Sequence, residues 1–171
     1  MRFIAALFSG SLLFLSAQGQ STVAIRTDTS LYVFGVVSDD QTQDTLPDSR
    51  ITIQDMREGY PDRELHANAD GKYSFYLGRG ARYRVTYTRF DRAAKTVEID
   101  AASVPDSSWH GGMSMEINMT LPKPFRGSDD AVFNEPIGRS RYNPATNLLE
   151  WDMEYTQLVK ERRKARREEL K

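Results

Sequence analysis

The residues best suited to chemistry in this sequence are two histidines, His66 and His110, and neither has a second base or metal ligand at a useful spacing. The chain has no cysteine and no Gly-x-Ser-x-Gly motif, which excludes a thiol nucleophile, a cysteine-bound metal and a serine nucleophile elbow. Trp109 directly precedes His110, and an exposed Trp-His loop could stack on a sugar or a peptide. We predict a flexible loop whose Trp109 covers the edge of the sandwich, and the alternative is a binding site at Trp109 and His110.

Two glycine-containing turns look at first like ligand loops. A calcium loop around Asp70-Gly71 would need a carboxylate at its first position and a glutamate at its twelfth, but His66 and Leu77 occupy those positions. The run 78–80, Gly-Arg-Gly, lacks the third glycine and the following helix of a dinucleotide site. These stretches predict a strand-entry turn and a hairpin connection, and the sequence predicts no catalytic set, metal or cofactor.

The C-terminal stretch 160–171 is strongly basic, with seven basic and three acidic residues in a chain whose net charge is -1. No aromatic side chain interleaves its charges, so nucleic acid is not an expected partner, and no apolar face accompanies them for insertion into a bilayer. The stretch is either a solvated helix end or an electrostatic docking tail. In the second case the binding residues would be the four arginines Arg162, Arg163, Arg166 and Arg167.

Alternation of apolar and polar residues dominates from about residue 31 to residue 121, and this period is typical of strands with one buried face. No segment with a helical period interrupts the series, which favours a mostly β protein. We predict a seven-stranded antiparallel β-sandwich, immunoglobulin-like or transthyretin-like. The predicted strands are 31–37, 50–55, 63–68, 72–77, 82–88, 95–100 and 114–121.

The remainder of the chain divides into an extended segment, 122–147, which is rich in proline, and a helix, 148–171, with Asn147 as its cap. Trp151 and Tyr155 fall on the apolar face of this helix and are predicted binding residues. That face becomes polar beyond Val159. The first three turns are therefore expected to dock, and the basic end is expected to project into water.

The N-terminal residues 1–19 read as a secretory signal peptide, with Arg2 before an apolar run and small residues near position 19. The apolar run is shorter than the roughly 20 residues that a membrane crossing needs. We expect cleavage, no membrane span in the mature protein, and a short lead at 20–30. Export without disulfides fits the periplasm or cell exterior of a bacterium.

Residues 31–121, and within them above all the stretches 31–55 and 66–100, resemble the carboxypeptidase regulatory-like domain, also called the transthyretin-like or prealbumin-like fold. The resemblance rests on Gly35-Val36 in the first strand, the Asp-Gly element within 68–75, and Tyr83-Arg84-Val85. It implies a domain that is usually non-catalytic and serves carboxypeptidases, outer-membrane receptors or small secreted bacterial proteins as an accessory. These motifs are turn and core positions, so no functional residue is carried over.

The combined interpretation is a non-catalytic, exported cell-envelope protein that acts as a structural or protein-interaction module with an envelope protein as partner, and not an enzyme. The alternative is a carbohydrate- or peptide-binding module that uses the loop at Trp109 and His110. A hydrolase is the third hypothesis.

Overall fold

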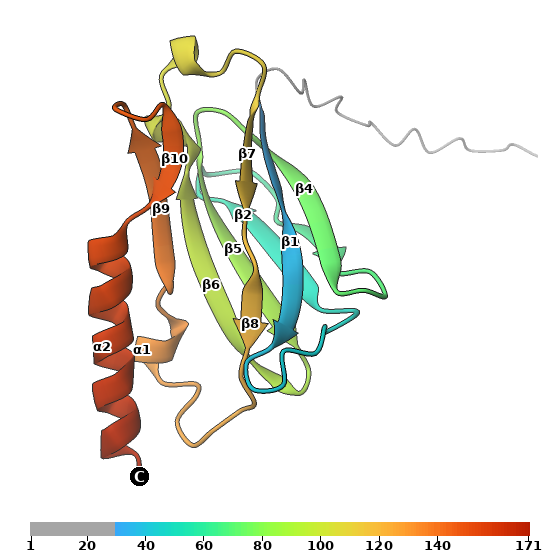
Figure 1. Cartoon of the computed structure of the whole chain (residues 1–171), viewed down its shortest axis with the longest axis vertical. Coiled ribbons are helices and arrows are strands. Elements are labelled where there is room, and N and C mark those ends of the chain that lie inside the picture. Colours follow the sequence, from blue (N-terminus) through green and yellow to red (C-terminus); the bar gives the residue numbers. More distant parts are fainter. Residues whose placement is uncertain (1–29) are drawn as a thin grey trace, which may run out of the picture.

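In a computed structural model, residues 30–171 form two β-sheets that pack face to face, with a long helix beside them (Figure 1). The predicted signal peptide 1–19 and all but the last residue of the predicted lead lie outside the described residues. Within residues 30–171, no helix is both long and apolar enough to cross a membrane. The mostly β class predicted from the sequence is confirmed.

The smaller sheet is built around strand β1 (Ser30–Asp39). Strand β4 (Lys72–Gly78) pairs with β1 antiparallel. On the other edge of β1, β7 (Met113–Glu116) and β8 (Met119–Leu121) follow each other and pair with it in parallel.

The larger sheet has six strands in the order β10-β9-β6-β5-β2-β3. Four of the five neighbouring pairs are antiparallel, and the fifth, between β6 and β9, is parallel. The prediction of seven strands in an antiparallel sandwich is therefore wrong, because the described chain has ten strands in mixed sheets. The six strands of the larger sheet are β2 (Arg50–Asp55), β3 (Arg63–His66), β5 (Arg82–Arg89), β6 (Arg92–Asp100), β9 (Gly138–Asn143) and β10 (Leu148–Trp151).

The predicted strand 114–121 is divided because the pairing with β1 is interrupted at Gly35. A Cβ at this position would lie 2.0 Å from the Ile117 carbonyl oxygen, so only glycine lets the two backbones approach this closely. The Val36 N–H is bonded by the side-chain oxygen of Asn118 at 3.0 Å instead of by a backbone carbonyl. The register on β1 nevertheless stays the same on both sides of the break.

The core between the sheets is formed by the alternating residues of both, as the period-two pattern predicts. Its polar centre is a pair of buried tyrosines, Tyr73 from β4 and Tyr87 from β5, whose hydroxyl oxygens are 2.8 Å apart. The Tyr73 hydroxyl also donates to the Ile117 carbonyl at 2.6 Å. The tyrosines thus connect the two sheets at the break between β7 and β8.

The predicted strand-entry turn at Asp70-Gly71 is confirmed. Gly71 has φ +71°, and the Asn68 side-chain oxygen accepts hydrogen bonds from the backbone N–H groups of Asp70 and Lys72. The predicted hairpin at 78–81 is wrong, because β4 belongs to the smaller sheet and β5 to the larger. The connection crosses from one sheet to the other.

The C-terminal third differs most from expectation. The segment predicted as extended contains a short helix, α1 (Ala131–Asn134), and strand β9. The long helix α2 (Met153–Glu169) begins after the predicted start, because residues 148–151 pair with β9 as strand β10. Asp152 caps the helix by accepting from the Tyr155 N–H at 3.0 Å, whereas Asn147 lies in the β9–β10 turn with φ 58°.

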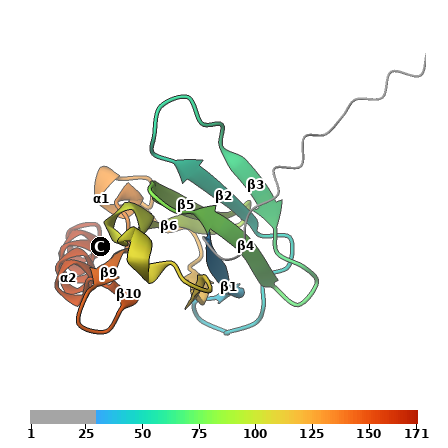
Figure 2. The ribbon, with the colours of Figure 1, turned by 90° about the horizontal axis from the view of Figure 1, so that it is seen from above.

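Two short 3-10 helices, η2 (Ala101–Ser103) and η3 (Asp106–Ser108), follow β6 before the chain enters β7. Figure 2 shows that β9, β10 and both α-helices gather on one side of the molecule, away from β2 and β3. The C-terminal third thus extends the larger sheet beyond β6 and covers the flank that β6 would otherwise expose.

Candidate functional site

The alternative binding site at Trp109 and His110 does not offer an exposed tryptophan. Only 2% of Trp109 is exposed, and its indole N–H donates to the Val104 carbonyl at 3.3 Å. His110 is exposed in the turn before Gly111, which has φ +81°. The structure therefore places Trp109 in the core, where a sugar or peptide could not stack on it without rearrangement of the loop.

The basic arginines of α2 are bonded to the α1 segment. Arg163 donates to two backbone carbonyls, those of Phe133 at 2.8 Å and Glu135 at 2.6 Å. Arg166 pairs with Asp130 at 2.7 Å, and Arg162 pairs with Glu135 at 2.9 Å.

Arg167 completes this contact by lying over the Phe125 ring at 4.3 Å. The expectation that the end of the helix projects into water is therefore wrong. All four arginines hold the helix to the segment that precedes β9.

Two further predicted residues, Trp151 and Tyr155, lie where β10 leads into α2. The Tyr155 hydroxyl donates to the Pro136 carbonyl at 2.9 Å, and the Arg139 guanidinium lies 4.1 Å from the centre of its ring. Trp151 covers Gly138, where a Cβ would lie 3.2 Å from the indole. Of the residues predicted to bind, Trp151 is the one that lines a cavity at this flank.

That cavity, which we call the lysine cleft, opens between the edge of the smaller sheet and the β9–α2 flank of the larger one. Its volume is about 300 Å³, at the small end of the range for ligand pockets. Most of its walls are apolar, and Met153 on its rim is 70% exposed. The cleft is lined by Lys95, Val97, Glu116, Ile117, Asn118, Met119, Thr120, Ile137, Gly138, Trp151, Met153 and Thr156.

Lys95 is the charged residue that β6 turns toward this cleft. It occupies the same face of the strand as Val97 and Ile99, both of which are buried. Its side chain is only 18% exposed, and its amine lies 3.2 Å from Thr120 Oγ1 and 3.5 Å from Asp40 Oδ1.

Burial lowers the pKa of the Lys95 amine, and the attraction of Asp40 opposes that shift. An ammonium has three N–H donors. Among residues 30–171 the amine has two polar partners, Thr120 through a hydrogen bond and Asp40 through an ion pair.

Sequence reasoning missed Lys95, although a signal for it was present. In the alternating stretch 95–100 the apolar residues Val97 and Ile99 define the buried face, and the same period puts Lys95 on that face. A lysine in phase with core residues has to find a partner or a cavity. Its partners Asp40 and Thr120 come from distant parts of the chain, which no local pattern could identify.

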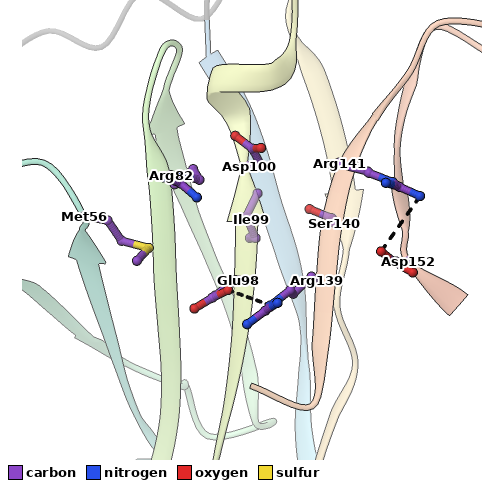
Figure 3. A pocket seen from close by; sticks show the side chains of 9 residues that line it. All are labelled: Met56, Arg82, Glu98, Ile99, Asp100, Arg139, Ser140, Arg141 and Asp152. Carbon is purple, nitrogen blue, oxygen red and sulfur yellow. Dashed lines mark ion pairs between the residues drawn. The ribbon is translucent and has the colours of Figure 1, made fainter. Parts of the chain in front are cut away.

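A second hollow, which we call the arginine groove, lies on the outer face of the larger sheet, where β5, β6 and β9 run side by side (Figure 3). Its volume is about 390 Å³. Charged side chains from all three strands and from the start of α2 surround it. The groove is lined by Met56, Arg82, Glu98, Ile99, Asp100, Arg139, Ser140, Arg141 and Asp152.

Within residues 30–171, no three histidine, cysteine, aspartate or glutamate side chains are grouped so that they could hold a metal ion. One of the acidic residues between positions 39 and 48 has a structural role. Asp39 is buried and bonded by Arg92 at 2.9 Å and by the N–H groups of Gln41 and Thr42. These hydrogen bonds, those from the two backbone N–H groups above all, lower the pKa of Asp39.

No protein-family model matches the chain. No curated protein matches its sequence. Similar solved structures include 3-chlorocatechol 1,2-dioxygenase from Rhodococcus opacus, with 12% identity, a TM-score of 0.43, and coverage of 56% of this chain and 61% of that one. Catechol 1,2-dioxygenase from Acinetobacter is 11% identical, with a TM-score of 0.44 and coverage of 67% and 59%. The Bacillus anthracis TIE protein is 15% identical, with a TM-score of 0.43 and coverage of 56% and 17%.

The chain therefore spans less than two thirds of the length of each of these three proteins. These neighbours correct the prediction of a non-catalytic module that is not an enzyme. Several are dioxygenases that act on catechol, chlorocatechol or hydroxyquinol, so the fold gives no ground for excluding catalysis. Identities of 10–15% carry no substrate or reaction to this chain. The resemblance to the carboxypeptidase regulatory-like domain stays a prediction.

Proposed function

We propose that the lysine cleft binds a small aromatic carboxylate, with its carboxylate on Lys95 and its ring against the apolar walls. The observation that carries the proposal is the inward-facing ammonium of Lys95, 18% exposed, at a cleft lined mostly by apolar side chains. Small-molecule sites typically combine such walls with a few convergent polar groups.

The Lys95 ammonium is the group of the cleft that would attract an anion, and it lies in a lining that also contains the acidic Glu116. Asp40 lies 3.5 Å from the Lys95 amine and also accepts a hydrogen bond from Thr120 Oγ1 at 2.9 Å, so its carboxylate is shared between Lys95 and Thr120. The positive charges of Arg163 and Arg167 add to the unfavourable field at the Lys95 ammonium. A carboxylate beside Lys95 would relieve this repulsion and accept an N–H of the ammonium in a charge-assisted hydrogen bond.

The shape and composition of the walls favour a ring. Trp151 contributes a flat aromatic face, and Met119 and Met153 contribute thioethers that make favourable contacts with aromatic groups. The volume of about 300 Å³ accommodates one or two fused rings with a carboxylate and leaves no room for a long chain. Val97 and Ile117 supply the remaining apolar surface near Lys95.

The proposal is tested by calorimetric titration with 1-naphthoate, and with 1-naphthalenemethanol as a neutral analogue of similar shape. A hydrogen bond to a charged group contributes about 1.5–3 kcal/mol. The Lys95→Met variant is therefore expected to bind 1-naphthoate about 10- to 100-fold more weakly, while its affinity for the alcohol changes little.

The matched control is Lys72→Met, which removes an exposed lysine on β4, away from the cleft. This variant is expected to bind 1-naphthoate like the parent protein. Unchanged affinity in Lys95→Met, or equally tight binding of the neutral alcohol by the parent protein, would show that Lys95 does not hold a carboxylate. No saturable binding of 1-naphthoate would reject the proposal as a whole.

A further inference from the structure

The outer face of the larger sheet carries two parallel rows of charges, and both cross the strands β5, β6 and β9. The pairing register sets Arg84 opposite Glu98 and Glu98 opposite Arg139, which gives the first row. Arg82 stands opposite Asp100 in the second row, and Arg141, two residues after Arg139, continues this row on β9. Each row therefore reads positive, negative, positive, and Figure 3 shows the second row at the upper part of the groove.

The first row is closed upon itself. The Glu98 carboxylate is bonded on one side by Arg84 at 2.9 Å and on the other by Arg139 at 2.9 Å. Both arginines therefore share one carboxylate, although the buried Arg84 Nε has no hydrogen-bond partner within residues 30–171. This row is the arrangement expected of a charged sheet surface that faces water.

The second row is not closed. Asp100 uses its carboxylate to accept from the Ser103 N–H at 3.2 Å, as the cap of helix η2, and forms no ion pair within residues 30–171. The Arg82 side chain has no hydrogen-bond or ion-pair partner in the same part of the chain. Arg141 is 71% exposed and reaches Asp152 only at 3.9 Å, while Asp152 also serves as the cap of α2. The two rows have the same charges, but only in the first does the carboxylate bind both arginines.

We propose that the arginine groove binds an acidic α-amino acid through this second row. The complement of positive, negative, positive is a ligand that carries a carboxylate, an ammonium and a second carboxylate in that order. Arg82 and Arg141 would each take one carboxylate, and Asp100 would take the ammonium. Arginine suits this task because its planar guanidinium can bind a carboxylate through two parallel hydrogen bonds.

The dimensions of the groove agree with a ligand of this size. Strands β5 and β9 flank β6, so Arg82 and Arg141 start about 10 Å apart, which is two strand spacings. Their side chains can lean toward each other over Asp100 and hold the two ends of a short dicarboxylate. Met56, at the edge of the groove, offers an apolar contact for the methylene groups. The volume of about 390 Å³ is ample for a single amino acid.

The inference is tested by calorimetric titration of the protein with L-glutamate, glutarate and 4-aminobutyrate. Glutarate lacks the ammonium, and 4-aminobutyrate lacks one carboxylate. L-Glutamate is expected to bind at least tenfold more tightly than either. Arg82→Met and Arg141→Met are each expected to weaken L-glutamate binding at least tenfold. Asp100→Asn is expected to weaken L-glutamate binding and to leave glutarate binding equal or tighter.

The matched control is Arg126→Met, which removes an exposed arginine outside the groove and is expected to leave every affinity unchanged. Thermal unfolding of each variant shows that it is folded. Absence of saturable L-glutamate binding, or retained affinity in both arginine variants, would overturn the inference and leave the second row as a solvated surface. Equal affinity for glutarate and L-glutamate would overturn the role of Asp100 and, with it, the amino-acid assignment. Titration of the same variants with 1-naphthoate separates this outcome from that of the lysine cleft, because Arg82 and Arg141 do not line that cleft.

Discussion

Tyr73 and Tyr87 each carry one buried hydroxyl group. Removing the hydroxyl of Tyr73 should destabilise the fold more than removing that of Tyr87. The single hydroxyl hydrogen of Tyr73 is donated to the Ile117 carbonyl at 2.6 Å. In the 2.8 Å contact between the two tyrosines, Tyr87 must therefore be the donor and Tyr73 the acceptor. Burial raises the pKa of both hydroxyls, so both keep their protons at neutral pH.

The Tyr73→Phe variant leaves two buried polar groups without a partner, the Ile117 carbonyl and the Tyr87 hydroxyl. Each unsatisfied buried group costs about 1–3 kcal/mol, so the two together are expected to lower the free energy of unfolding by about 2–6 kcal/mol. The Tyr87→Phe variant keeps the bond from Tyr73 to Ile117 and loses only the donor to Tyr73. Its expected loss is about 1 kcal/mol, which is typical of one hydrogen bond.

Urea unfolding followed by circular dichroism measures both losses, provided that the slopes of the two transitions agree. The double variant completes a cycle that isolates the contact between the tyrosines. The reasoning is refuted if Tyr87→Phe is as destabilising as Tyr73→Phe. That result would mean that the Ile117 carbonyl has another donor, or that the hydroxyl of Tyr87 is the one that serves it.

Three further predictions concern Arg163, Asp39 and Lys95. Arg163→Met should lose about 1–3 kcal/mol of stability and speed hydrogen exchange in the last turns of α2, because the bonds to Phe133 and Glu135 disappear; the exposed Lys164→Met should not. The pKa of Asp39 is lowered in the folded protein, so the ionised carboxylate stabilises the fold above the usual pKa of 3.8, and this stability is lost as pH falls through the lower folded pKa. Thermal unfolding at a series of acid pH values should show a smaller loss of stability for Asp39→Asn than for the parent protein. The same pH profile in both proteins would contradict this prediction. Burial lowers the pKa of Lys95, so the affinity for 1-naphthoate should fall as pH rises through a value below 10.5, and Lys95→Met should abolish that pH dependence.

The local pattern predicted the strands well where one face of each strand is buried. The alternation in 82–88 and 95–100 places Tyr83, Val85, Val97 and Ile99 in the core, as the structure confirms. Pairing partners were beyond reach, because alternation reveals which face is buried and not which neighbour lies at the edge. The parallel partners of β1 and β6 are set by contacts between segments that are distant in the sequence.

The C-terminal third shows why a helical period can mislead over a short stretch. Leu148, Trp151 and Tyr155 have the spacing of one helix face, but only Tyr155 lies in the helix. Residues 148–151 instead satisfy their backbone groups by pairing with β9, and four residues are too few for the period to distinguish the two structures. The helix start is marked in the sequence by Asp152, which caps α2 by accepting a hydrogen bond from the Tyr155 N–H.

The lysine cleft and the arginine groove are both lined by strands β6 and β9. They lie on opposite faces of the larger sheet, because successive residues of a strand point to opposite faces. Lys95 and Val97 point to the lysine cleft, and Glu98 and Asp100 point to the arginine groove. Neither hollow would exist on a sandwich that ended at β6, since β9 supplies Arg139 and Arg141 on the outside and Gly138 on the inside. Trp151 and the start of α2 then complete the cleft. The sequence after residue 121, which has the weakest local pattern, therefore creates the surfaces on which both proposals rest.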